Sequence, residues 1–119
     1  MITESATNPH VDEKVLSALQ EVMEDEYPAL LDTFLNDSQH RLLALQAASD
    51  PQAISLAAHS FKGSSSNMGA VVLAQLCSRL EQCANQPSGC DIQQLIREID
   101  QEFGEVRPVY ERERERYSA

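Results

Sequence analysis

The sequence predicts an all-α protein, an up-and-down antiparallel four-helix bundle with an additional short N-terminal helix that caps one end. Apolar residues recur at helical spacing in five segments, which short polar turns separate. The chain has no Trp and few other aromatic residues, so aliphatic side chains must fill the core, which favours packed helices. Its 119 residues suit one domain, and no segment shows the period-two alternation of a strand.

The first two helices are predicted from apolar stripes on either side of an acidic break. Residues 1–9 are polar and are expected to form a flexible lead-in. A short helix should follow and end near Glu24, where three acidic residues interrupt the pattern. Pro28 suits the first turn of a second, long helix that ends near Ala48. The two stripes comprise Val11, Val15, Leu16, Leu19 and Met23, and then Leu31, Phe34, Leu35, Ser38, Leu42 and Leu45.

The third helix has clear signals at both ends. Asp50 is a suitable N-cap and Pro51 suits the first helical position. The helix should run to about Met68 and end near Gly69, which can adopt the left-handed conformation of a C-cap. One side of this helix should face the core: Ile54, Ala57, Ala58, Phe61, Ser65 and Met68.

A fourth helix is predicted from about Ala70 to Asn85, followed by a loop over residues 85–89. Asp91 and Gln94 then have the spacing of a capping box that opens the fifth helix. The inward stripe of that helix should contain Ile92, Leu95, Ile96, Ile99, Phe103 and Val106.

The C-terminal segment differs in composition from the rest. Pro108 is expected to end or kink the fifth helix. Residues 107–119 then form a charged helical extension that we expect to be solvated. Acidic and basic residues alternate there, with i,i+3 pairs such as Glu111 with Arg114 and Glu113 with Arg116.

Charge and composition exclude several classes of partner. The formal net charge of −10 disfavours nucleic acid and anionic membrane surfaces. The chain has neither an apolar run long enough to span a membrane nor an N-terminal secretion signal, so we expect a cytoplasmic protein. The odd number of cysteines then suggests free thiols, with Cys77 in the core and Cys83 and Cys90 outside any zinc motif.

The third helix carries a reactive side chain on its outer face. His59 should point away from the core, with Lys62, Gly63 and Ser66 following it on the same side at i+3, i+4 and i+7. Gly63 and the following serines have low helix propensity, so helix formation does not explain their presence. An open patch of backbone beside an exposed imidazole would let another surface reach its nucleophilic nitrogen.

These residues resemble the histidine-containing phosphotransfer (HPt) domain family. The matching pattern is His59, an apolar residue at Phe61, Lys62-Gly63, Ser64-Ser65-Ser66, Gly69-Ala70 and then an amphipathic helix with Leu73, Leu76, Cys77, Leu80 and Glu81. Phe61 stands where the family often has Leu, which is an apolar exchange. The resemblance covers residues 10–106 as one domain and is closest to the stand-alone bacterial type.

The resemblance implies a phosphorelay intermediate of two-component signal transduction that is no enzyme, since it has no ATP site. His59 would accept a phosphoryl group from a receiver-domain aspartate of a hybrid sensor kinase and pass it to a response regulator. Lys62 would stabilise the phosphoryl group and Gly63 would admit the partner. Ser55, Leu56 and Ser66 would line the docking surface. The protein would be a monomer without its own cofactor, and the receiver domain would supply Mg²⁺.

Other functions fit the residues less well, although a helical adaptor that binds receiver domains without accepting phosphate stays open. A carboxylate-bridged metal site needs Glu-x-x-His pairs, and neither His40 nor His59 has a Glu three residues earlier. Residues 63–69 lack the ending of a phosphate-binding loop and of a nucleophile elbow. His10 and His40 are expected to be solvated, and no acid is evidently placed to orient His59.

Overall fold

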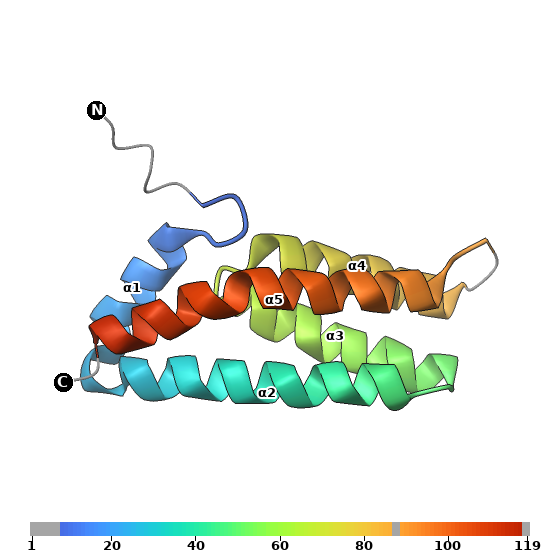
Figure 1. The fold of residues 1–119 in the computed structure, drawn as a ribbon, viewed down its shortest axis with the longest axis horizontal. Coiled ribbons are helices and arrows are strands. Elements are labelled where there is room, and N and C mark those ends of the chain that lie inside the picture. The colour runs from blue at the N-terminus through green and yellow to red at the C-terminus, as the bar shows by residue number, and fades with distance from the viewer. Residues whose placement is uncertain (1–7, 87–88, 118–119) are drawn as a thin grey trace.

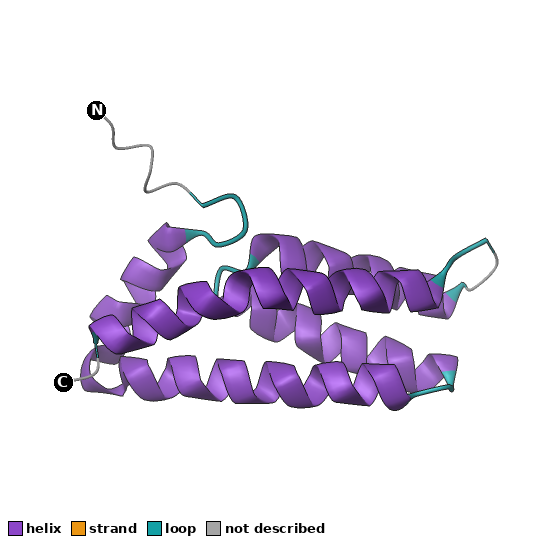
Figure 2. Ribbon diagram, viewed as in Figure 1, coloured by secondary structure: helices purple, strands orange, loops and turns teal. Residues whose placement is uncertain are grey.

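The computed structural model describes residues 8–86 and 89–117, which form helices joined by short connections and contain no strand (Figures 1 and 2). The elements are α1 (Glu13–Met23), the 3-10 helix η2 (Glu24–Glu26), α2 (Tyr27–Ala47), α3 (Pro51–Asn67), α4 (Val71–Asn85) and α5 (Ile92–Arg116). The all-α prediction is confirmed. Residues 1–7 of the predicted lead-in lie outside the described residues. Within the described ranges, no helix is both long and apolar enough to cross a membrane.

The four long helices lie side by side, and each runs opposite to the one before it (Figure 1). α2 contacts α3 and α5, and α4 contacts the same two helices. α1 and η2 stand at the end where α2 begins and α5 ends.

Aspartate side chains start the helices as expected from their sequence positions. The Oδ1 of Asp50 accepts a hydrogen bond from the backbone nitrogen of Gln52 at 3.3 Å, and the Oδ1 of Asp91 accepts one from that of Gln94 at 3.0 Å. Each bond satisfies an amide that the first turn leaves unpaired. The Gln94 side chain donates to Glu98 rather than reaching back to the Asp91 amide, so only half of the predicted capping box forms.

The α3–α4 turn is held from outside by the segment before α1. Gly69 has a φ of +78°, and its carbonyl accepts a hydrogen bond of 2.8 Å from the Asp12 amide. A Cβ at Gly69 would lie 2.9 Å from the Asp12 carbonyl, so both the backbone conformation and the space require glycine. The carbonyl of His10 accepts a hydrogen bond from the Val71 amide. The Nδ1 of the His10 ring lies 2.8 Å from the buried carboxylate of Glu102. His10, predicted to be solvated, is only partly so, because its side chain is 37% exposed while Glu102 engages its ring.

The predicted apolar stripes form the core. Every position of the α2 stripe is buried except Leu35, which is partly buried against the core. The same holds for the α3 stripe, in which only Ala57 is partly exposed. Two large buried side chains were not part of the predicted stripes, namely Tyr27 at the start of α2 and Tyr110 near the end of α5.

Pro108 does not end α5, so of the two predicted outcomes, an end or a kink, the kink is the one that fits. The helix continues to Arg116, although its ribbon changes direction in the second half (Figure 1). Proline removes one backbone hydrogen bond and crowds the preceding turn. Burial of Val106 and Tyr110 on either side offsets that cost, and the Tyr110 hydroxyl donates a 2.7 Å bond to the Met68 carbonyl.

The last turns of α5 dock on α2 instead of extending into solvent. The guanidinium of Arg114 binds the Asp32 carboxylate through two bonds of 2.9 and 3.0 Å. The Tyr27 hydroxyl donates to Glu113 at 2.7 Å. The prediction of a solvated extension is wrong at these positions because the sequence pattern did not reveal partners that lie more than 80 residues away.

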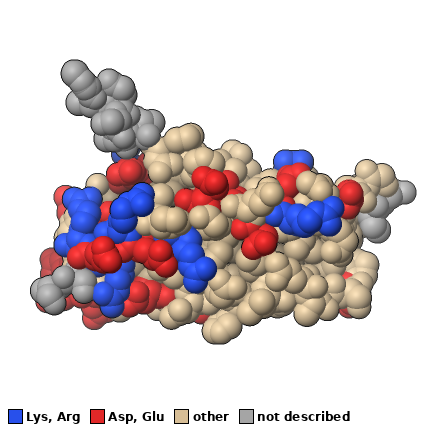
Figure 3. Space-filling view, viewed as in Figure 1, with Lys and Arg blue, Asp and Glu red and all other residues tan. Residues whose placement is uncertain are grey.

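Charged side chains of both signs are interleaved over this end of the molecule (Figure 3). The predicted pair of Glu113 with Arg116 is confirmed at 3.3 Å. Glu111 pairs with Arg107 at 3.4 Å. The pair of Glu111 with Arg114 stays a prediction. Such exposed pairs contribute little stability individually.

The cysteines divide into a buried thiol and a disulfide. Cys77 is free and fully buried, as predicted, and burial raises the pKa of its thiol to about 12. Cys83 and Cys90 form a disulfide, with 5.7 Å between their Cα atoms. The prediction of free thiols is therefore wrong for these two residues, because the fold brings the end of α4 beside the residue that precedes α5.

Candidate functional site

The outer face of α3 presents His59 to solvent. The next residues on the inner face, Ala58 and Phe61, have no exposed surface, whereas 65% of the His59 side chain is accessible. The helical register of the buried stripe therefore forces the imidazole outward. This orientation is the one predicted from the sequence.

A carboxylate from α4 holds the imidazole. The Nδ1 of His59 lies 3.0 Å from Oε2 of Glu81. One turn earlier on α3 and one turn later on α4, the Ser55 hydroxyl donates to the Asn85 side chain, also at 3.0 Å. The two bonds show one antiparallel register between the helices. Sequence reasoning missed Glu81 as the acid that orients His59, although counting outward along both helices from the turn at Gly69 could have found it.

This contact determines which ring nitrogen can react. An ionised carboxylate only accepts hydrogen bonds, so in the neutral imidazole the proton lies on Nδ1 and is donated to Glu81. The lone pair then lies on Nε2, at the far side of a largely exposed ring. Nε2 is therefore the ring nitrogen whose lone pair faces away from Glu81.

Lys62 shares the same carboxylate. Its Nζ lies 3.5 Å from Oε1 of Glu81, and its side chain is a little over one-third exposed. Glu81 thus bridges the imidazole and the ammonium group, which follow one another by three residues on α3. The ammonium group is close to His59 and still accessible to an anion that arrives from solvent.

The other predicted site residues surround His59 on α3 but differ in exposure. A Cβ added at Gly63 would meet no atom within 4 Å, so the fold itself does not need glycine there. Leu56 is 66% exposed and Ser66 is also exposed. Ser55 is only partly exposed and is engaged by Asn85. The structure thus places all of them on or beside one open face, with Ser55 at its edge.

Among the described residues, no group of three His, Cys, Asp or Glu side chains could hold a metal ion. His10 contacts Glu102 on α5, away from the α3–α4 pair that holds His59. His40 is exposed on α2, as expected. The functional groups gathered at His59 are therefore an imidazole, an ammonium group and a carboxylate.

Fold and site together define an all-helical protein that presents one oriented, solvent-facing histidine beside a lysine. The Hpt domain family model matches residues 29–107, and the chain belongs to this family. It is also similar to the crystal structure of histidine-containing phosphotransfer protein B (HptB) from Pseudomonas aeruginosa PAO1. The two share 52% identity with a TM-score of 0.89, over 93% of this chain and 99% of the other. A search of curated proteins gave no match.

Family membership makes this chain a phosphorelay protein of two-component signalling, a phosphocarrier whose partners are receiver domains. The family match begins within α2 and ends at Arg107. α1 and the last turns of α5 lie outside it.

Proposed function

We propose that His59 is the phosphoacceptor, which takes a phosphoryl group from a receiver-domain aspartate of a hybrid sensor kinase and passes it to the aspartate of a response regulator. The observation that carries this proposal is the orientation of the ring. Glu81 binds Nδ1 at 3.0 Å while 65% of the side chain faces solvent, which leaves Nε2 available. In this mechanism the fold supplies a positioned nucleophile, and the partner supplies the phosphoryl group.

In the transfer step, the lone pair on Nε2 attacks the phosphorus of the partner's acyl phosphate. An N–P bond forms, the bond from phosphorus to the aspartyl oxygen breaks, and the aspartate leaves as a carboxylate. The imidazole ring gains positive charge and keeps its proton on Nδ1. The carboxylate of Glu81, which accepts that proton in a hydrogen bond, stabilises this charge. The reverse sequence returns the phosphoryl group to the next aspartate.

Lys62 supports the charge on the phosphoryl oxygens. The transferring group is anionic, and cations placed around it lower the barrier. The Lys62 ammonium group lies 3.5 Å from Glu81 and remains accessible, so it can turn to the phosphoryl group on Nε2. We propose that Mg²⁺ comes from the receiver domain and that this chain needs no cofactor of its own.

The receiver domain would dock over the face formed by Ser55, Leu56, Gly63 and Ser66. The exposed Leu56 side chain gives this face an apolar contact, and the absence of a side chain at Gly63 lets the partner backbone come close to His59. A Leu56→Asp change should reduce the transfer rate at least about tenfold through lost apolar contact. Val22→Asp, at an apolar residue of α1 that is 79% exposed, is the control.

The overall arrangement and setting complete the proposal. The alternating directions of α2 to α5 and their mutual contacts support an up-and-down four-helix bundle, with α1 as a cap across one end. We propose a cytoplasmic monomer that carries phosphate without kinase activity. The net charge of −10 supports protein partners rather than nucleic acid or membrane.

Phosphotransfer from a labelled receiver domain tests the role of His59. With Mg²⁺ present, the chain should gain label that acid removes and base does not. His59→Gln should abolish it, whereas His40→Gln, at an exposed histidine of α2, should retain it. Label on the His59 variant would refute the assignment, and binding without any label on the parent would favour the adaptor function.

A second pair of variants tests Lys62. The chain has only two lysines, Lys14 on α1 and Lys62 on α3. Lys62→Ala should slow transfer about 10 to 100-fold, the usual range for one charged hydrogen bond. Lys14→Ala should leave the rate unchanged, and equal rates for the two variants would contradict a role for the Lys62 cation.

A further inference from the structure

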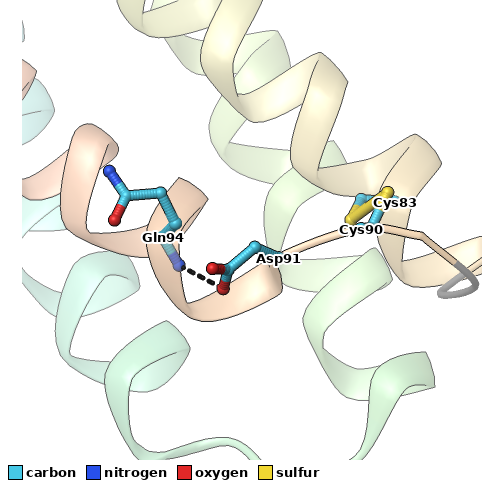
Figure 4. Close-up of a disulfide and its surroundings, with 4 residues drawn as sticks. All are labelled: Cys83, Cys90, Asp91 and Gln94. Atoms are coloured by element: carbon cyan, nitrogen blue, oxygen red, sulfur yellow. Dashed lines mark hydrogen bonds between the residues drawn. A yellow bond between two sulfur atoms is a disulfide. The ribbon is translucent and has the colours of Figure 1, made fainter.

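The disulfide joins the end of one helix to the start of the next (Figure 4). Cys83 lies in the last turn of α4 and is only 2% exposed. Cys90 is exposed and directly precedes Asp91, the N-cap of α5. Their Cα separation of 5.7 Å is within the range that disulfides occupy without backbone movement. The fold thus holds the two sulfur atoms in position to bond.

We propose that Cys83 and Cys90 are a reversible thiol–disulfide site, which fastens α4 to α5 when it is oxidised. The inference rests on the proposed cytoplasmic location, because disulfides in reducing compartments are transient and serve redox sensing or catalysis. It concerns a site other than the histidine. Cys77, which is fully buried in the core, takes no part.

The surroundings of the pair admit a small reactant. An open groove of about 500 Å³ is lined by both cysteines, and Arg79, Gln86 and Gln94 are among its other lining residues. Because Cys90 is the exposed member, it meets an incoming molecule first. The groove has room for a small disulfide or thiol to reach that sulfur.

The oxidising reactant is a small-molecule disulfide, and the reaction is exchange. The Cys90 thiolate attacks one sulfur of the reactant, which releases one thiolate and leaves a mixed disulfide. The Cys83 thiolate then attacks the Cys90 sulfur and releases the second thiolate. Two protein thiols are oxidised to one disulfide while the small disulfide is reduced to two thiols. Reduction by a small dithiol runs the same steps in reverse.

The bond restrains a part of α4 that supports the histidine face. Asn85, two residues after Cys83, accepts the hydrogen bond from Ser55, and Glu81, two residues before it, holds His59. The last turn of a helix frays unless something ties it down. We therefore expect the disulfide to slow opening of residues 82–85, and its reduction to release them.

Thiol mapping of the full chain tests the first half of the proposal. Treatment of the reduced chain with a small disulfide should lower its mass by about 2 Da, with loss of two reactive thiols and retention of Cys77. A dithiol should reverse this without denaturant and without loss of helicity. A mixed disulfide that persists on Cys90, or a bond that is reduced only after unfolding, would overturn the inference.

Hydrogen exchange tests the second half and needs no phosphate. Reduction should speed amide exchange in residues 82–85 several-fold, with little change in α1. Cys90→Ser should exchange like the reduced parent and ignore reductant. Gln93→Ser, at an exposed residue of the first turn of α5, should respond like the parent. Equal exchange in the oxidised and reduced chains would show that the bond restrains nothing.

Discussion

The Nδ1 of His59 lies 3.0 Å from Oε2 of Glu81, which connects the exposed face of α3 to α4. Through its second oxygen, the same carboxylate lies 3.5 Å from Lys62. One acidic residue therefore orients the imidazole, favours its Nδ1–H tautomer and keeps a cation nearby. The pair is only partly exposed on the Glu81 side, which strengthens these interactions relative to a fully solvated pair.

Replacing Glu81 by Ala should slow phosphorylation of His59 about 10 to 100-fold, since a hydrogen bond to a charged group is lost. Glu81→Gln should have a smaller effect, because its amide oxygen can still accept from Nδ1 while the charge is gone. Nitrogen NMR of the His59 ring should show the Nδ1–H tautomer in the parent and a mixture in the Ala variant. Glu105→Ala, at an exposed acid of α5, is the control. Unchanged rate and tautomer in Glu81→Ala would contradict the assigned role.

Substitutions at Gly63 should affect the stability of the fold and the access of a partner to His59 in different ways. Ala at this exposed helical position should raise the free energy of unfolding by about 1 kcal/mol, because glycine disfavours helix and the new Cβ has no neighbour. Gly63→Gln should keep the fold and slow transfer by crowding Nε2 of His59. Gly104 on α5 is equally open, so Gly104→Gln is the matched control and should transfer normally. Should Gly63→Gln match the parent in transfer rate, the open backbone patch would have no role.

Two buried tyrosines predict a loss of stability at high pH. Burial raises the pKa of Tyr110, and burial with the hydrogen bond to Glu113 raises that of Tyr27. In the unfolded chain, both tyrosine hydroxyls ionise near pH 10. The free energy of unfolding that their burial contributes is therefore complete below about pH 10 and is lost as the pH rises toward the higher pKa of the folded state. Urea unfolding at several pH values should show the free energy of unfolding declining above about pH 10. Tyr27→Phe and Tyr110→Phe should each flatten the decline, and a decline that neither change alters would contradict this explanation.

Pro108 should be a destabilising residue in the interior of α5. Ala at this position restores a backbone donor to the helix and should raise the free energy of unfolding by up to about 3 kcal/mol. Pro28, in the first turn of α2, lacks no helical hydrogen bond, so Pro28→Ala should give no such gain. Urea denaturation of both variants checks this. A Pro108→Ala protein no more stable than the parent would mean that the bend of α5 is required for docking its last turns.

Much of the fold follows from local pattern. The bounds of α2, α3 and α4 agree with the predicted ones to within one residue, because apolar periodicity, Asp50 and Gly69 act within a few residues of one another. The docking of the last turns of α5 did not follow, because Tyr110 and Arg114 have partners on Met68 and Asp32, which are distant in the sequence. The same limit hid the Cys83–Cys90 pair, whose closeness depends on how α4 ends and α5 begins.

The sequence by itself determined that His59 faces outward with Lys62 and Gly63 beside it, since all three lie on one helix whose register the buried stripe defines. Only the tertiary structure decided which atom of the ring can react. That depends on Glu81, 22 residues later, which the antiparallel packing of α3 and α4 brings within hydrogen-bonding distance. Periodicity specifies the face of a helix, but the choice of neighbour across an interface depends on how two helices align.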